Sequence, residues 1–382
     1  MMSGSQPAPS AANLAFFGSK VDNTVFAAIS RLFTTPFRWN HWNGAPVLYK
    51  DVLFAAIRAM LSNLTIAQSR YLNKSTSETY QDFCKAISQE PKTVKLESGT
   101  TTAHWIGNKN ADVVILFLHG GGYTQPCTPQ HMQYFHRLVT DLNKLSDGTP
   151  SISVLLLAYT LAPEAQFPIQ LKQAVSMLSY LLNEAGKSPM DIMITGDSAG
   201  GGLILSLLSH LLHPHPDIPK LSISMPLRAA FLYSPWVSFD TSHDSYTKND
   251  VKDTLVPDIL RKWAGSYLGT VDRETDPGVV VGGNNYSEPL LADASWWEGM
   301  HNIVKDMWIW AGENEVFLDS LRDFGAKFSD GWKVGGGAEE SIKLEFGKND
   351  AHIGPIMDVM LQYKEKSETQ LGLEEWLKVR LA

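Results

Sequence analysis

A serine between small residues is the first group in this chain that can do chemistry. Ser198 stands in the stretch Gly196–Gly200 (Gly-Asp-Ser-Ala-Gly), after the apolar run 192–194 and before a helical run that begins at Leu203. A serine at the tip of a strand-turn-helix exposes its hydroxyl, and flanking glycines let the backbone pass through the sharp turn. The free N–H groups of the first helical turn favour negative charge beside it. The pattern predicts a nucleophile, although an ordinary glycine-rich turn carries the same letters.

A run of three glycines supplies the second chemical signal. His119-Gly120-Gly121-Gly122-Tyr123 directly follows the apolar run 113–118. N–H groups without neighbouring side chains can approach a substrate oxygen closely, and the tetrahedral intermediate of acyl transfer needs donors about 3 Å from its oxyanion. We therefore interpret this loop as an oxyanion hole that serves Ser198, rather than as a loop that is merely flexible.

Both motifs resemble those of the hormone-sensitive-lipase-like branch of the α/β-hydrolases. The stretch 159–168 is similar to that branch's Y-R-L-A-P-E-x-x-F-P segment, and 233–236 is similar to its strand-end S-P-W. Thr160 stands where the branch has arginine, which puts a local ion pair in doubt. The resemblance extends from residue 92 to the end of the chain. It implies a serine esterase with the α/β-hydrolase fold, in which a mostly parallel central sheet is flanked by helices and covered by a helical cap.

The family's chain order places the catalytic acid and base after the serine. The family pattern G-x-D-x-L-x-D matches the stretch 312–319 with Glu315 in the acid's place, and Glu313 and Asp319 are the alternatives. His352 follows the apolar run 342–346 and precedes a helical stretch, where the general base is expected. A glutamate is competent to hold the imidazole's tautomer and stabilise its charge. The resemblance thus implies the triad Ser198, Glu315 and His352.

The resemblance also assigns the oxyanion donors. In the family, the first two glycines of the glycine run and the residue after the serine donate their N–H groups, which implies Gly120, Gly121 and Ala199 here. Asp197 and His119 are expected to organise the two loops through hydrogen bonds rather than to react. Acyl transfer of this kind requires no metal or organic cofactor, and we expect none.

Alternating strands and helices are expected to position these loops. Apolar and alternating runs predict strands at 93–96, 101–106, 113–118, 152–159, 192–195, 227–233, 307–310 and 342–346, with helices at 168–185 and 254–268 between them. This alternation predicts a mostly parallel sheet covered on both faces. The interval 237–301 has no strong strand signal. Together with residues 1–90 it is predicted to form a helical cap on a catalytic domain that spans 91–382.

Aromatic residues near the motifs and in the expected cap give the only indication of the substrate. If Tyr123, Trp236 and Trp296, and also Trp39 and Trp42, line a pocket, the pocket suits a hydrophobic short-acyl ester, although a tryptophan more often fills a core. The overall pattern resembles fungal members of the branch that act on steryl acetates and secondary metabolites. An amidase such as a formamidase, an acyl-transferring or cyclising enzyme, and a non-catalytic small-molecule receptor remain alternatives on the same fold.

Composition excludes several other classes of function. A net charge of −8 over 382 residues argues against a nucleic-acid surface. The two cysteines, Cys84 and Cys127, have no metal-binding or redox spacing, and His210, His213 and His215 lack carboxylate or thiol company, so we interpret these histidines as a solvated helix end. No secretory signal or membrane-spanning run is visible, which makes a cytoplasmic location the default expectation.

The amino-terminal stretch 51–71 carries apolar residues at helical spacing, with Asp51 as its expected N-cap. This stripe is expected to pack as a lid over the core. Peripheral contact of the amino-terminal helices with lipid is the alternative, and it is less favoured because the polar face is not strongly basic. A small-molecule ester is the expected partner, and the sequence does not determine the oligomeric state.

Overall fold

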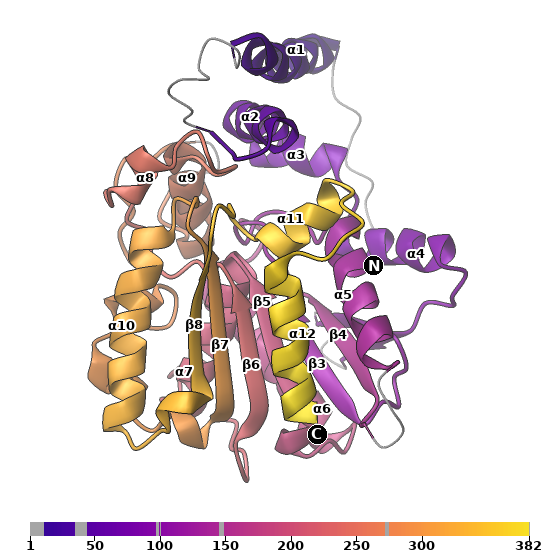
Figure 1. Ribbon diagram of the computed structural model, residues 1–382, viewed down its shortest axis with the longest axis vertical. Helices are drawn as coiled ribbons and strands as arrows, with labels where there is room; N and C mark the ends of the chain where they lie inside the picture. Colours follow the sequence, from indigo (N-terminus) through magenta and orange to yellow (C-terminus); the bar gives the residue numbers. More distant parts are fainter. Residues whose placement is uncertain are drawn as a thin grey trace.

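An eight-stranded sheet runs through the molecule (Figure 1). The computed structural model describes residues 11–34, 44–96, 99, 101–144, 149–271 and 275–381, and it describes no side chains for residues 11–22. The strands are β1 (Thr93–Lys95), β2 (Thr102–Ile106), β3 (Val113–Leu118), β4 (Ile152–Ala158), β5 (Ile192–Asp197), β6 (Leu227–Tyr233), β7 (Val304–Gly312) and β8 (Ile342–Gly347). Their order across the sheet is β1-β2-β4-β3-β5-β6-β7-β8. Only the pairs that involve β2 are antiparallel, so the predicted mostly parallel sheet is confirmed.

The sheet separates two hydrophobic cores because side chains alternate along each buried strand. On β3, Val114, Leu116 and Leu118 face the core that also holds α6 (Ile169–Asn183), α7 (Ala199–Leu212) and α10 (Leu318–Val334). The residues between them face the core that holds α5 (Pro129–Leu142) and α12 (Glu368–Leu381). In Figure 1, α12 lies in front of the sheet and α7 lies behind it. All six residues of β3 are fully buried, as its uninterrupted apolar run predicts.

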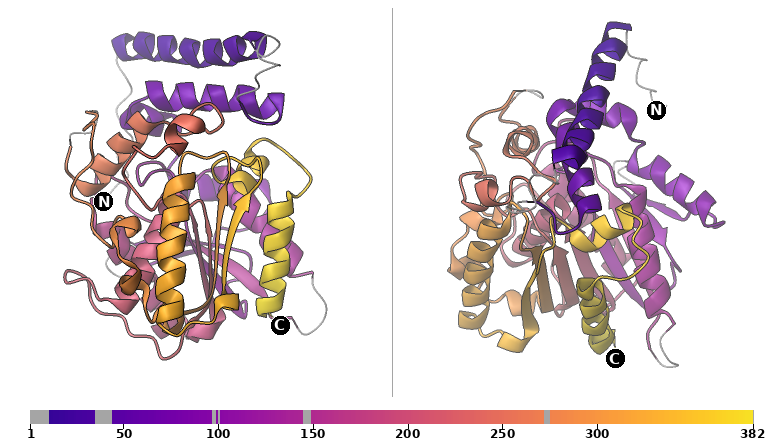
Figure 2. Two further views of the ribbon diagram at one scale, coloured as in Figure 1. Left: turned by 60° about the vertical axis from the view of Figure 1, so that its left-hand side comes forward. Right: turned by 45° about the horizontal axis from the view of Figure 1, so that its top comes forward.

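The helices of the amino-terminal region lie beyond the carboxyl edge of the sheet. Figure 2 shows α1 (Ala11–Thr34) outermost, with α2 (Leu48–Asn63) beneath it, and α3 (Ile66–Leu72) connects them to the body. The helix α4 (Thr76–Ala86) follows on the flank, where it packs on α5. Trp39 and Trp42, two of the expected pocket residues, lie outside the described residues.

Asp51 does not cap α2, which contradicts the sequence prediction. The helix begins three residues earlier, at Leu48, and Asp51 faces inward, where it is fully buried. Its carboxylate accepts hydrogen bonds from the guanidinium of Arg31 on α1, at 2.5 and 2.7 Å, and from the N–H of Ala45 at 3.1 Å. A buried carboxylate needs such partners, so this aspartate joins α1 to α2 instead of starting a helix.

Only the first part of the interval 237–301 joins the amino-terminal helices. The helices α8 (Ser245–Lys248) and α9 (Pro257–Leu268) lie at the same end as α1–α3, and α2 contacts α9 (Figure 1). The short 3₁₀ turns at Pro289–Leu291 and Ala294–Trp297 instead pack along α10, on the flank of the sheet, and a third turn at Met300–Asn302 contacts β7. As predicted, the described residues between β6 and β7 form no strand.

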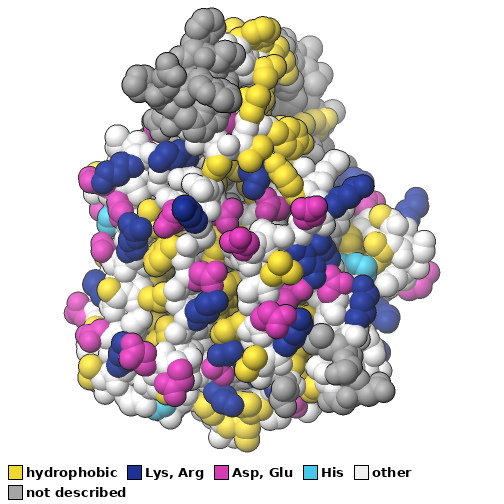
Figure 3. Space-filling model, in the orientation of Figure 1, with side chains coloured by type: hydrophobic (Ala, Val, Ile, Leu, Met, Phe, Trp, Pro, Cys, Tyr) yellow, Lys and Arg dark blue, Asp and Glu magenta, His cyan; other side chains and the backbone are white. Residues whose placement is uncertain are grey.

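The side of α1 that points away from α2 is apolar and exposed. Val25, Phe26, Ile29, Leu32 and Phe33 are between 46% and 70% exposed, at positions that fall on one helical face. Hydrophobic side chains gather at this end of the space-filling view (Figure 3). No helix among the described residues combines the length and the apolar character that crossing a membrane requires. Contact with lipid therefore remains a prediction, in which this face of α1 would bind to the membrane surface.

Candidate active site

Ser198 occupies the tight turn between β5 and α7. Its backbone has φ 52° and ψ −121°, in a region of conformational space that non-glycine residues rarely adopt. Such strain persists only where the surrounding structure imposes it, and it is concentrated at functional sites. Here the N–H of Ser198 donates to the Tyr233 carbonyl at 2.9 Å, and its own carbonyl accepts the N–H of Trp236 at 2.8 Å. The end of β6 therefore holds the serine backbone in place.

The glycines around the serine permit a close approach of two backbones. A Cβ on Gly200 would overlap the carbonyl oxygens of Leu118 and His119, and a Cβ on Gly196 would overlap the backbone of Gly200. The first turn of α7 can therefore pass against the end of β3. This contact brings the glycine run 119–122, which directly follows β3, beside Ser198.

Asp197 connects the serine turn to the glycine loop. Its carboxylate is 1% exposed, accepts the N–H of Gly120 at 2.9 Å, and lies 3.0 Å from Nε2 of His131. Nδ1 of His131 is 2.7 Å from the hydroxyl of Thr128, which fixes the orientation of the ring. Burial alone would raise the pKa of Asp197, but His131 and the Gly120 amide bring it below its ordinary value. Asp197 thus stays ionised and organises both loops.

His119 is a structural histidine. Burial lowers its pKa to about 4, so the ring is neutral near pH 7. Its Nδ1 lies 2.8 Å from the carbonyl oxygen of Gly120, and its ring stacks on Tyr159 at a centroid distance of 4.4 Å. The hydroxyl of Tyr159 donates to the His119 carbonyl at 2.7 Å. These contacts hold the ring in place and stabilise the loop.

The amide of Gly120 is already engaged, which contradicts its prediction as an oxyanion donor. Its only N–H points at Asp197, so it cannot serve a substrate in this conformation. No described residue accepts a hydrogen bond from the N–H of Gly121 or Gly122. The N–H of Ala199, the first residue of α7, has no acceptor within the helix. The loop amides without an acceptor are thus those of Gly121 and Gly122, one position further along the loop than the predicted Gly120 and Gly121.

His352 and Glu315 form a buried pair at the same edge of the sheet. Nδ1 of His352 lies 3.1 Å from Oε2 of Glu315, which is fully buried, and the histidine is 4% exposed. Burial would lower the pKa of His352, but the carboxylate of Glu315 more than offsets this effect, so the pKa stands above its ordinary value. Burial raises the pKa of Glu315, and the imidazole opposes this rise. Of the two alternative acids, Glu313 is exposed, and Asp319 accepts the N–H of Ser245 at 2.7 Å.

Ser234 joins the histidine loop to the serine turn. Its hydroxyl accepts the N–H of Ile353 at 3.1 Å, and the preceding residue, Tyr233, holds the Ser198 amide. The loops after β5 and β8, which carry Ser198 and His352, are thereby connected through the end of β6. The described residues form no direct hydrogen bond between the two side chains. Catalytic hydrogen bonds are often long in a ligand-free site and tighten when substrate binds.

The acid loop is held by residues that sequence reasoning missed. Asp253, fully buried, accepts the N–H of Val316 at 2.7 Å, and the side chain of Asn249 donates to the Glu315 carbonyl at 2.9 Å. The charge of Asp253 also contributes to the raised pKa of His352. Both residues come from the stretch before α9, far from Glu315 in the chain. No local motif marked them, because their role depends on this tertiary contact.

The three expected pocket aromatics have different surroundings. Tyr123 and Trp236 are buried beside the serine turn, with ring centroids 5.9 Å apart, and Trp236 also stacks on Phe317. Trp296 does not belong to the site: its indole N–H donates to the hydroxyl of Ser209. At 1.5 Å per residue, that position on α7 is about 15 Å from the serine turn. The prediction of Trp296 as a substrate contact is therefore wrong.

The histidines near the end of α7 are not a solvated helix end, which corrects the sequence interpretation. His210 is 1% exposed and His215 is 7% exposed. The N–H of His215 donates to Nδ1 of His210 at 3.0 Å, and Nε2 of His210 lies 3.2 Å from the Pro219 carbonyl. Within the described parts of the chain, no group of three or more histidine, cysteine or acidic residues is arranged to hold a metal ion.

Comparisons with known proteins agree with this fold. Residues 115–337, more than half of the chain, match the model of a family described by its α/β hydrolase fold. An acetyl-hydrolase of Streptomyces hygroscopicus is 30% identical over 210 residues, 54% of this chain and 64% of that protein. Steryl acetyl hydrolase 1 of Saccharomyces cerevisiae is 29% identical over 44% of this chain and 37% of that protein. The aligned part of the chain thus spans less than two thirds of these relatives.

The fold has counterparts among solved structures. An esterase of the bacterial hormone-sensitive lipase family superposes with a TM-score of 0.60 and 22% identity, and the match covers 88% of this chain and all of that one. We draw the family assignment from three observations: the sheet order, the strained serine turn after β5 and the extent of the family match. The chain belongs to the α/β-hydrolase family.

Proposed function

We propose that this protein is a serine carboxylic-ester hydrolase with Ser198, His352 and Glu315 as its catalytic triad. The observation that carries the proposal is the meeting of a strained serine turn and a buried imidazole–carboxylate pair at one edge of the sheet. The acetyl-hydrolases among its relatives support the same reaction class. We also propose that α1–α3, with α8 and α9, act as the cap over this edge, and that the rest of the chain from residue 91 is the catalytic domain.

The proposed mechanism follows from the roles that these groups can take. His352 accepts the proton of the Ser198 hydroxyl, and the serine oxygen attacks the ester carbonyl carbon. The collapse of the tetrahedral intermediate breaks the C–O bond, and His352 returns its proton to the departing alcohol. Water then repeats the sequence on the acyl-serine and releases the acid. Throughout, Glu315 holds the proton on Nδ1 of His352 and stabilises the imidazolium.

We assign the oxyanion hole to the N–H groups of Gly121, Gly122 and Ala199. The first two have no acceptor among the described residues, and the third is at the start of α7, where the helix dipole favours negative charge. The engagement of Gly120 with Asp197 supports the shift of one position from the original prediction. Each such donor contributes about 3–4 kcal/mol to the stabilisation of the transition state in related chemistry.

The substrate proposed is a hydrophobic ester with a short acyl group, such as an acetate. Between α2, α3 and α9, beside the loop residue Gln125, is a small cavity of about 10 Å³ with mostly apolar walls, which include Met60, Leu61, Ile259 and Trp263. That volume is close to the space one water molecule needs. In this proposal the alcohol portion of the ester enters between these helices and contacts their apolar side chains, which requires the helices to move apart. The name of the Saccharomyces cerevisiae relative, a steryl acetyl hydrolase, is consistent with a bulky apolar alcohol.

Turnover of a p-nitrophenyl ester series from acetate to decanoate tests this proposal. We expect the highest kcat/KM with the short acyl groups and no turnover by the Ser198→Ala variant. A preference for long chains would contradict the acyl specificity. Unchanged turnover by Ser198→Ala would contradict the mechanism itself. Labelling of Ser198 by a fluorophosphonate would exclude a non-catalytic receptor.

A further inference from the structure

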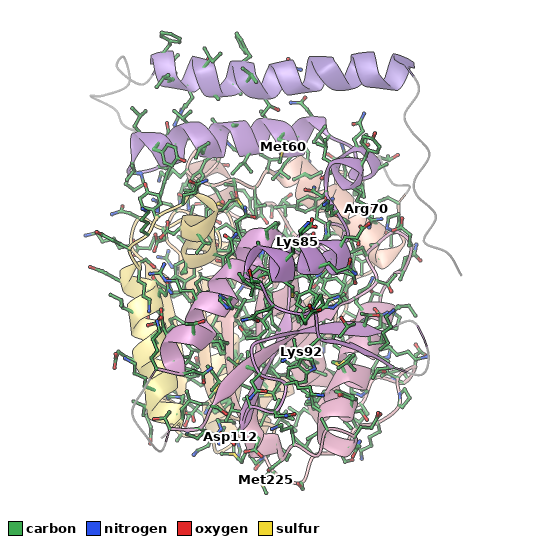
Figure 4. All side chains as sticks on the ribbon, turned by 90° about the vertical axis from the view of Figure 1, so that its right-hand side faces the viewer. Met60, Arg70, Lys85, Lys92, Asp112 and Met225 are labelled. Carbon is green, nitrogen blue, oxygen red and sulfur yellow. The ribbon has the colours of Figure 1, made fainter. Side chains whose placement is uncertain are left out.

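Arg70 on α3 joins the amino-terminal helices to the two loops beside the glycine run. Its guanidinium donates from Nε to the Thr124 carbonyl at 2.8 Å, from Nη2 to the Ala162 carbonyl, and from Nη1 to the Glu164 carboxylate. Figure 4 labels Arg70 between the outer helices and the body of the molecule. Its side chain is 11% exposed, whereas that of Glu164 is 52% exposed. An exposed carboxylate contributes little to such a pair, so the bonds to the two carbonyls provide most of the positioning.

The two residues whose carbonyls Arg70 binds, Thr124 and Ala162, are themselves hydrogen-bonded to the glycine loop and to Tyr123. The amides of Thr124 and Gln125 donate to the Gly121 carbonyl at 3.0 and 2.9 Å, which closes the turn directly after the glycine run. The amide of Ala162 donates to the Tyr123 carbonyl at 2.8 Å. Arg70 therefore ties together both ends of a short network that contains Gly121 and Tyr123.

A neighbouring residue of α3 and a residue of α9 support the same loop. The hydroxyl of Ser69 donates to the side-chain oxygen of Gln125 at 2.7 Å. The ring of Trp263 lies so close to Gly122 that a Cβ there would overlap it. Gly121 and Gly122 both have positive φ, at 102° and 59°. Glycine adopts many backbone conformations at similar cost, so the loop depends on outside contacts to keep one of them.

Arg70 forms an ion pair in the segment where Thr160 departs from the arginine of the resembled family pattern. The backbone and hydroxyl of Thr160 bond to the amide side chain of Gln173 at 2.8 Å each. The carboxylate of Glu164, four residues further on, pairs with Arg70. The cation is thus contributed by an amino-terminal helix, so the position of that helix and the conformation of the glycine loop are coupled.

We propose that Arg70 is a positioning residue of the oxyanion hole. By binding Thr124 and Ala162 it holds the amides of Gly121 and Gly122 where negative charge develops in the transition state. This inference rests on the ester-hydrolase function proposed above. It predicts that loss of Arg70 impairs the stabilisation of the oxyanion more than the binding of the ground-state ester.

The test compares Arg70→Gln with wild type in two measurements on the full chain. The first is kcat and KM for p-nitrophenyl acetate. The second is the inhibition constant of an aryl trifluoromethyl ketone, which forms a tetrahedral oxyanion adduct with an active serine. We expect kcat to fall by about 10- to 100-fold, since a misplacement of about 1 Å can cost 10²-fold. The inhibition constant should rise by a similar factor while KM changes little, because the interaction exists only in the transition state.

Three further variants separate positioning from general stability. Glu164→Gln keeps both carbonyl bonds and should retain nearly all activity. Arg70→Lys should be impaired like Arg70→Gln, because an ammonium group cannot reproduce a planar fork of donors. Arg228 is the matched control: its guanidinium also binds two carbonyls, of Met190 and Arg380, near the start of β6. Arg228→Gln should lower the melting temperature but leave kcat and the inhibition constant unchanged.

Several outcomes would overturn the inference. A folded Arg70→Gln protein with wild-type kcat and inhibition constant would do so, and so would an equal loss of kcat in Arg228→Gln. If Arg70→Gln fails to fold, Arg70→Lys and Ser69→Ala decide, and wild-type inhibition constants in both would refute the coupling of α3 to the loop. Wild-type protein that turns over no ester would overturn the proposed function, and this inference with it.

Discussion

Replacement of Glu315 by glutamine tests the central pair of the site. The substitution preserves the shape of the side chain and removes its charge. Glu315 is fully buried, and its Oε2 lies 3.1 Å from Nδ1 of His352. The glutamine can turn its NH₂ group toward that nitrogen. The ring proton would then move to Nε2, where it prevents the ring from accepting the serine proton.

The size of the loss can be worked out from this geometry. Two unit charges about 4 Å apart interact with about 4 kcal/mol at an effective dielectric constant of about 20. Because about 1.4 kcal/mol corresponds to a tenfold change in rate, losing this stabilisation of the imidazolium lowers kcat by on the order of 10³-fold. The wrong tautomer adds to this effect, and the comparable substitution in a serine protease costs about 10⁴-fold. We therefore expect kcat to fall by between about 10³- and 10⁴-fold.

The pH dependence supplies an independent check. The carboxylate of Glu315 raises the pKa of His352, and hydrolysis requires the neutral ring. In wild type, kcat/KM should therefore rise with pH through a midpoint above about 6.5, the ordinary pKa of histidine. Without the carboxylate the pKa of His352 falls, so this midpoint should move to lower pH while the plateau drops.

Initial rates with p-nitrophenyl acetate across pH measure both effects, and Glu313→Gln serves as the control. Glu313 is exposed, so its substitution should leave the plateau and the midpoint unchanged. The reasoning fails if Glu315→Gln keeps kcat within a few fold of wild type. It also fails if the large loss appears in Glu313→Gln or Asp319→Asn instead.

Three further predictions follow from the packing. Gly200→Ala should lower the free energy of unfolding by about 1–3 kcal/mol or more, because there is no space for its Cβ. Denaturant unfolding measures this, and Gly372→Ala, where the Cβ has open space, is the control that should not be destabilised. His131→Ala should cost about 1–3 kcal/mol near neutral pH, because it removes one of the two donors to the buried Asp197 carboxylate. Since His131 helps to keep the pKa of Asp197 low, this difference should shrink as pH falls below about 4. The Phe26 side chain on α1 is 70% exposed, and Phe26→Ser should weaken cosedimentation with phosphatidylcholine vesicles without affecting ester turnover. Cosedimentation equal to that of wild type would refute the lipid contact.

The strands and the reactive loops could be read from local sequence. A fully apolar run such as 113–118 has no amphipathic alternative, so it must be a strand buried on both faces. Parallel strands place their carboxyl ends at one edge, so loops that follow β3, β5, β7 and β8 converge there whatever their separation in the chain. The chain order of the resembled family then singled out Ser198, Glu315 and His352 on these loops as a candidate triad.

Which partner each polar group takes was decided only by the tertiary structure. The amide of Gly120 bonds to a carboxylate 77 positions away, and Arg70 bonds to Glu164 across 94 positions. Trp296 lies at the opposite end of α7 from the serine, although its type and position suited a pocket. Residue types and spacing determine the local backbone and the order of the loops. Hydrogen bonds between distant segments depend on how whole helices pack, and no short stretch of sequence records that packing.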